Sequence, residues 1–89
     1  MPEIARSLKG KIVVTMNYSD HNPPHFHVRQ GRNKALVDIK DAVVMAGTLS
    51  RDVLYRVLAW CVSHRKELLD DWERSKRGME LNHIDWTID

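Results

Sequence analysis

The stretch HFHVRQGRNKALVDIK, residues 25–40, decides the fold because its pattern predicts two strands joined by a tight turn. Polar and apolar residues alternate over 25–29, within a first strand expected over 25–30. His25 and His27 should therefore project from one face of this strand, and the apolar residues between and after them from the other face. A second strand is expected over 34–40, after the turn residues Gly31, Arg32 and Asn33. The stretch predicts an antiparallel hairpin with one apolar face.

The apolar pattern favours one register for this hairpin, because its apolar residues should share a face. That register has the facing pairs Gln30–Ala35, Val28–Val37 and Phe26–Ile39. It also places His27 opposite Asp38 and leaves Leu36 on the face of the histidines. A slip by one residue would bring the Asp38 carboxylate to the core face, which is unfavourable.

The sequence on either side of the hairpin predicts the rest of the fold. Strands are expected over 11–18, 42–49 and, at the end of the chain, 81–88. Ser50 is the expected N-cap of one long helix with an irregularity near His64, and Gly78 should stop it. Its apolar stripe is Val53, Leu54, Val57, Leu58, Cys61, Leu68 and Trp72. The predicted class is α+β, with a small curved antiparallel sheet of about four to five strands packed against this helix.

Size and composition predict one domain spanning residues 1–89. The chain carries 14 basic and 12 acidic residues and a net charge of +2, which argues weakly for nucleic acid as a ligand. Neither a signal-peptide pattern nor an apolar run of about 20 residues is present, so we expect a cytoplasmic protein without membrane contact. The one cysteine, Cys61, should be a buried, inert thiol.

Three of the five histidines lie in the segment DHNPPHFHV, residues 20–28. Pro23 and Pro24 stiffen the chain just before the strand begins. His25 and His27 should then lie about 6–7 Å apart on one strand face. His21, on the preceding loop, can fold back toward them. Any chemistry of this chain is expected here.

One interpretation of the segment is a metal site formed by His21, His25 and His27, because neutral imidazole binds zinc and other transition metals. Three protein ligands would leave a coordination position open. Asp38 would then orient the His27 ring as a hydrogen-bond acceptor. Asp20 or Asp38 would be the base of a zinc hydrolase.

A second interpretation is metal-free acid–base catalysis on a phosphodiester. His25 and His27 would act as base and acid, because histidine titrates near neutral pH. Arg29 or Lys40 on the same face would contact the phosphate. A third interpretation needs no ligand: Asp20, Asn22 and the prolines form a hydrogen-bonded turn, and the histidines pair with Asp38 and backbone groups.

The residues also resemble a known family. The segment 20–28, together with MPEIAR (1–6), KALVDI (34–39), LAW (58–60) and ELLDDW (67–72), is similar to the bacterial family called domain of unknown function 4160. The resemblance covers nearly the whole chain, although members typically carry an aromatic residue near Ser7 and Leu8. The histidines are also similar to the motif of the histidine-triad nucleotide hydrolases, but Arg29 stands at the third alternating position, so that match fails.

The family resemblance implies small prokaryotic proteins that are often encoded beside a partner of the domain of unknown function 2442 type, an arrangement like that of toxin–antitoxin pairs. We therefore expect a component of a two-protein module that acts through protein–protein interaction, with the histidine-lined sheet face as its functional surface. The alternative is a ribonuclease-like or metal-dependent phosphodiester hydrolase using His25 and His27, with RNA as a ligand. The sequence leaves open whether the protein is an enzyme or a homo-oligomer.

Overall fold

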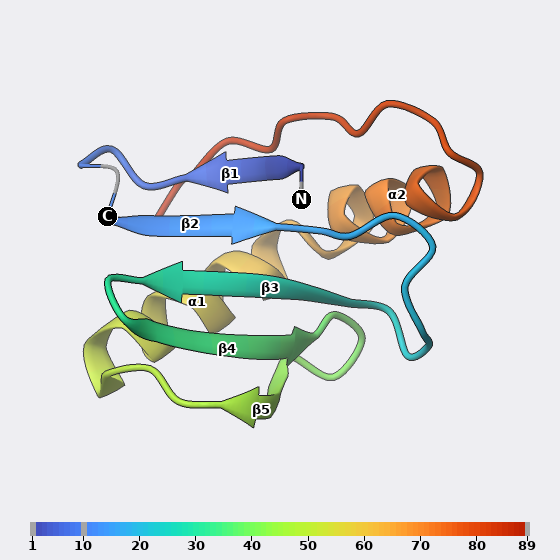
Figure 1. The fold of residues 1–89 in the computed structure, drawn as a ribbon. Coiled ribbons are helices and arrows are strands. Elements are labelled where there is room, and N and C mark those ends of the chain that lie inside the picture. Colours follow the sequence, from blue (N-terminus) through green and yellow to red (C-terminus); the bar gives the residue numbers. More distant parts are fainter. Residues whose placement is uncertain (1, 10, 89) are drawn as a thin grey trace.

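The computed structural model describes residues 2–9 and 11–88 and has an antiparallel sheet beside two helices (Figure 1). The strands form a simple meander in the order β1-β2-β3-β4-β5. Their bounds are Glu3–Arg6 (β1), Ile12–Thr15 (β2), His25–Gln30 (β3), Asn33–Asp38 (β4) and Val43–Gly47 (β5). The helices are Arg51–Ser63 (α1) and Arg65–Lys76 (α2). The predicted α+β class and number of strands are confirmed.

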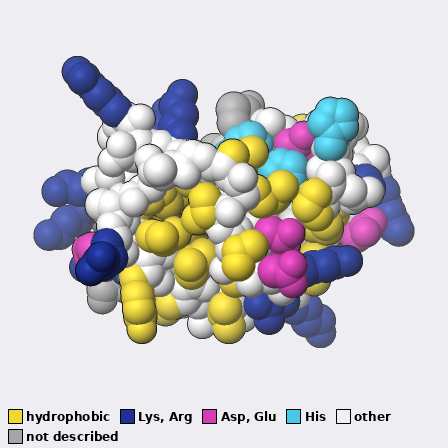
Figure 2. All heavy atoms as spheres, turned by 90° about the horizontal axis from the view of Figure 1, so that it is seen from below, with side chains coloured by type: hydrophobic (Ala, Val, Ile, Leu, Met, Phe, Trp, Pro, Cys, Tyr) yellow, Lys and Arg dark blue, Asp and Glu magenta, His cyan; other side chains and the backbone are white. Residues whose placement is uncertain are grey.

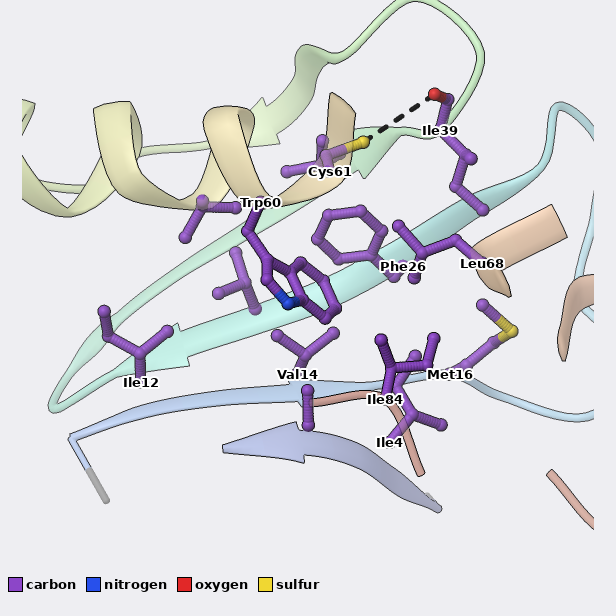
Figure 3. Close-up of a cluster of buried hydrophobic side chains, with 14 of the residues drawn as sticks. Ile4, Ile12, Val14, Met16, Phe26, Ile39, Trp60, Cys61, Leu68 and Ile84 are labelled. Atoms are coloured by element: carbon purple, nitrogen blue, oxygen red, sulfur yellow. Dashed lines mark hydrogen bonds between the residues drawn. The ribbon is translucent and has the colours of Figure 1, made fainter. Parts of the chain in front are cut away.

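The core lies between the sheet and the helices. Alternation along β2 and β3 turns Val14 and Phe26 to this side, and both are fully buried. Trp60 of α1 fills the centre, with its ring edge-to-face against Phe26 at 5.8 Å between centroids (Figure 3). α1 passes behind β3 and β4 in Figure 1, so the opposite face of these strands is open. The sheet is not strongly curled, and the predicted curvature is wrong.

The β3–β4 hairpin has a different register from the predicted one. Gln30 faces Asn33, so that only two residues form the turn, and Gly31 adopts a positive φ of 61°. His27 faces Leu36, and His25 faces Asp38. The predicted pairing of His27 with Asp38 is therefore wrong by two residues. A shift by two keeps every side chain on its face, so the apolar pattern could not distinguish the two registers.

The ends of the chain also differ from the prediction. The sheet begins with β1, which the sequence pattern did not reveal, and β2 covers only the centre of the predicted strand 11–18. Residues 79–88 form no strand, although the Ile84 amide donates a hydrogen bond to the Ile4 carbonyl of β1 at 2.7 Å. Ile84 and Trp86 are buried, whereas their neighbours Asp85 and Thr87 are exposed. The alternation of buried and exposed residues in this segment therefore reflects packing against the core and not pairing with a neighbouring strand.

The predicted single long helix is wrong, because the chain turns at His64 between α1 and α2. The His64 ring contacts Glu67 Oε1 at 2.6 Å and Thr87 Oγ1 at 2.8 Å, and these bonds tie the turn to the C-terminal segment. The predicted irregularity near His64 lies at this turn. Leu68 and Trp72 are still buried after it, so the apolar spacing continues and did not predict two separate helices. The predicted N-cap is confirmed, because Ser50 Oγ accepts a bond from the Val53 amide.

Cys61 is fully buried in α1, as predicted, and its Sγ lies 3.7 Å from the Ile39 carbonyl. Burial raises the pKa of this thiol to about 11, so it is protonated at neutral pH and is a poor nucleophile. Within the described ranges 2–9 and 11–88, neither helix has the length and apolar character needed to cross a bilayer.

Candidate functional site

The open face of the sheet carries a groove of about 550 Å³. Strand alternation supplies its lining, because every second residue of β2, β3 and β4 projects away from the helices. Apolar side chains from Val13, Leu36 and Ala46 form part of the wall. Polar and charged residues complete it: Glu3, Thr15, His27, Arg29 and Lys34. We call this surface the outer groove.

Basic residues dominate the charge of the outer groove. Arg29 is shared with a neighbouring hollow that Arg6 and Lys11 also line. The one acidic side chain, Glu3, contacts Arg6 with atoms 2.6 Å apart, and this bond holds the pKa of the Glu3 carboxyl below its usual value. Among the described residues, neither Arg29 nor Lys34 forms an ion pair. The groove therefore offers a net positive charge beside apolar side chains.

A histidine cluster lies at one end of this groove. His27 belongs to both, and its ring centroid is 5.5 Å from that of His25, as expected for two residues on one strand face. His25 is almost fully buried because its ring packs against Trp72 of α2 at 5.2 Å. Histidine side chains gather at one corner of the surface in Figure 2, beside an acidic side chain.

Asp20 holds the two imidazole rings together. Its Oδ2 lies 3.0 Å from His25 Nε2 and 3.4 Å from His27 Nε2. Partial burial raises the pKa of the Asp20 carboxyl, but the bond from the His21 amide and those from His27 and His25 outweigh burial and hold the pKa below its usual value. Asp20 is therefore ionised at neutral pH and faces both rings as a carboxylate.

Backbone and amide groups fix the orientation of the rings. His25 Nδ1 lies 2.8 Å from the Pro23 carbonyl, and His27 Nε2 lies 3.2 Å from Asn17 Nδ2. The proline-stiffened loop thus places its own carbonyl against the first histidine of β3. The predicted hydrogen-bonded turn agrees with this contact and with the bond from the His21 amide to Asp20 Oδ1 at 2.8 Å.

The structure brings together only part of the predicted metal set. His25, His27 and Asp20 offer ligand atoms that all lie within 4.8 Å of one another, whereas His21 is exposed and is not part of this group. Sequence reasoning named Asp20 as a base and not as a ligand, although its place just before the histidines was the available signal. Asp38 lies opposite His25, and its Oδ1 accepts a bond from the Asp41 amide at 3.0 Å.

The two cations predicted to contact a phosphate, Arg29 and Lys40, are exposed, whereas the His25 ring is buried. Arg29 is exposed on β3, two residues after His27, and therefore projects from the same face. Lys40 is exposed in the turn that follows β4. Of these two cations, Arg29 is the one that lines the outer groove.

A comparison with protein families agrees with the resemblance in the sequence. The model of the family described as Domain of unknown function (DUF4160) matches residues 12–73, which include β2 to β5, α1, most of α2 and the whole histidine cluster. No curated protein and no solved structure matches the chain. Since the family model covers more than half of the 89 residues, the chain belongs to the DUF4160 family.

Proposed function

We propose that this protein is one component of a two-protein, toxin–antitoxin-like module and that it binds its partner through the outer groove. The observation that carries this proposal is a groove of about 550 Å³ on a sheet face that α1 does not cover. The combination of apolar side chains with a few placed polar groups is typical of binding sites. The partner expected from the family resemblance is a protein of the domain of unknown function 2442 type.

The charge of the groove indicates the chemistry of the partner segment. Arg29 and Lys34 line the groove and form no ion pair with another described residue, and Glu3 is paired with Arg6. A segment with an apolar side chain to contact Leu36 and carboxylates to contact these cations is complementary to the surface. Such complementarity contributes specificity and speeds association.

A second candidate function is a ribonuclease-like hydrolase, which the convergence of two imidazoles on one carboxylate favours. His27 is better placed for proton transfer than His25, because 27% of its side chain is exposed, against 7% for His25. Arg29 lies on the same face to contact a phosphate. In this alternative Asp20 orients the rings, and RNA is the substrate class.

Substitutions in the groove should weaken the complex with the product of the neighbouring gene. We expect Arg29→Glu and Leu36→Asp to raise the dissociation constant at least about tenfold. Arg29→Glu places a carboxylate where the partner is proposed to present its own, and Leu36→Asp places one against the apolar side chain of the partner. Isothermal titration calorimetry on the purified pair measures this effect. Lys66→Glu is the matched control, since Lys66 is exposed on α2, and it should leave the affinity within about twofold.

Unchanged affinity in both groove variants would contradict the proposal, and so would the lack of any complex. RNA cleavage by the wild-type protein that is lost in His27→Ala would favour the hydrolase instead. Both experiments use the whole chain, so that the two candidate functions are tested on the same material.

A further inference from the structure

The geometry points to a site for one divalent transition-metal ion of the zinc class, held by Asp20, His25 and His27. This site adjoins the proposed partner-binding groove, because His27 belongs to both. It differs from the set expected from the spacing of the histidines, because Asp20 takes the place of His21. The ligand atoms of the three side chains all lie within 4.8 Å of one another.

The distances in the cluster match those of a metal-ligand set. Zinc bonds to nitrogen and oxygen of about 2.0–2.2 Å place two tetrahedral ligands about 3.3–3.6 Å apart. Asp20 Oδ2 lies 3.0 Å from His25 Nε2 and 3.4 Å from His27 Nε2. Shifts of a few tenths of an ångström would bring Asp20 to the separation expected of a ligand. The two histidine ligand atoms lie within 4.8 Å of each other and would approach by up to about 1 Å to hold the ion.

The hydrogen bond on the far side of the His25 ring supports a cation between His25 and Asp20. A carbonyl oxygen only accepts, so the contact of Nδ1 with the Pro23 carbonyl at 2.8 Å places a proton on Nδ1. In the neutral ring, the lone pair of Nε2 then faces the Asp20 carboxylate. Two electron-rich atoms in this position require a proton or a metal ion between them. Metal-ligating histidines commonly donate their other N–H to a backbone carbonyl, as His25 does.

The same reasoning applies to His27. An amide nitrogen donates, so Asn17 Nδ2 at 3.2 Å marks the position of the Nε2 lone pair of His27. The same atom lies 3.4 Å from Asp20 Oδ2, so a ring nitrogen of each histidine approaches one carboxylate oxygen.

The surroundings suit a fixed but accessible ion. Trp72 packs against the His25 ring and limits its motion, whereas the side chains of Asp20 and His27 are 19% and 27% exposed. An ion can therefore enter from solvent and keep an open coordination position toward the outer groove. Two imidazoles with one carboxylate bind zinc, iron, cobalt and nickel, so zinc and cobalt are suitable probes.

Titration of the tag-free protein with zinc chloride tests the site directly. Calorimetry should give one zinc ion per chain and a raised melting temperature, because the ion binds the native state. Asp20→Asn and His27→Gln should each weaken binding at least about tenfold, since even residues that only support metal ligands contribute about 10–100-fold. The expected cobalt complex has the visible spectrum of a low-coordinate site, and His27→Gln should change it.

His21→Ala is the matched control, because His21 is adjacent to Asp20 in sequence but lies outside the cluster. It should leave the zinc affinity unchanged. The inference is overturned if zinc gives neither heat nor stabilisation. It is also overturned if His21→Ala abolishes binding while Asp20→Asn does not. Because these experiments use the isolated chain, their failure leaves the proposed partner binding standing.

Discussion

Trp60→Ala is expected to lower the free energy of unfolding by about 3–5 kcal/mol, because it removes the largest side chain at the centre of the core. Trp60 is fully buried, and its ring lies against Phe26 at 5.8 Å and Trp86 at 5.2 Å between centroids. Its Nε1 also donates a 2.8 Å hydrogen bond to the Asp85 carbonyl, which ties the C-terminal segment to α1. The substitution should therefore loosen that segment as well as the core.

Urea unfolding followed by circular dichroism measures this loss. A domain of 89 residues is expected to have a total stability of about 4–13 kcal/mol, so the variant should be marginal. Tyr55→Ala is the matched control on α1, because its side chain is 78% exposed, and it should change stability by no more than about 0.5 kcal/mol. Similar losses in the two variants would contradict the central role of Trp60.

Gly47→Ala should also destabilise the protein strongly, by about 3 kcal/mol or more, because the site has two separate requirements for glycine. The φ of Gly47 is +80°, a conformation that costs other residues about 1–2 kcal/mol. A Cβ atom would in addition lie 2.2 Å from the Lys34 carbonyl oxygen and 2.9 Å from Ala35 Cα. Since both are backbone atoms of β4, β5 would have to move away from its partner strand.

Gly31→Ala separates the two requirements. Gly31 also has a positive φ, of +61°, but an added Cβ would meet no atom within 4 Å. It should therefore show only the conformational cost, about 1 kcal/mol. Thermal unfolding of both variants gives the comparison. Equal losses would mean that the close approach of β5 to β4 at Gly47 is incorrect.

The sequence predicted which side of the sheet each side chain lies on better than it predicted which residues face each other across neighbouring strands. The alternation in 25–30 placed His25 and His27 on one side of β3 and Phe26 on the core side, and their positions agree. Alternation has a period of two residues, however, so it is unchanged by the two-residue shift that brings Asp38 opposite His25. The helix pattern also could not predict two separate helices, because Leu68 and Trp72 continue the apolar spacing after the turn at His64.

The sequence predicted the strand residues of the candidate site, His25 and His27. It did not predict that the loop residue Asp20 contacts both of their rings. A strand fixes the direction of side chains two residues apart, so the pairing of His25 with His27 follows from their spacing. The loop from Asn17 to Pro24 has no such period. Its path places the carboxylate of Asp20 against both rings and leaves His21 exposed, and this outcome depends on contacts such as that of the Pro23 carbonyl with His25.

Methyl NMR on the complex tests the proposed docking surface most directly. The chain, labelled at its leucine, valine and alanine methyl groups, would be titrated with the unlabelled product of the neighbouring gene. Binding through the outer groove predicts that the largest shift changes occur at Leu36, Val13 and Ala46, with no change at Val62, which is exposed on α1. Shifts at Val62 with Leu36 and Ala46 unaffected would contradict it.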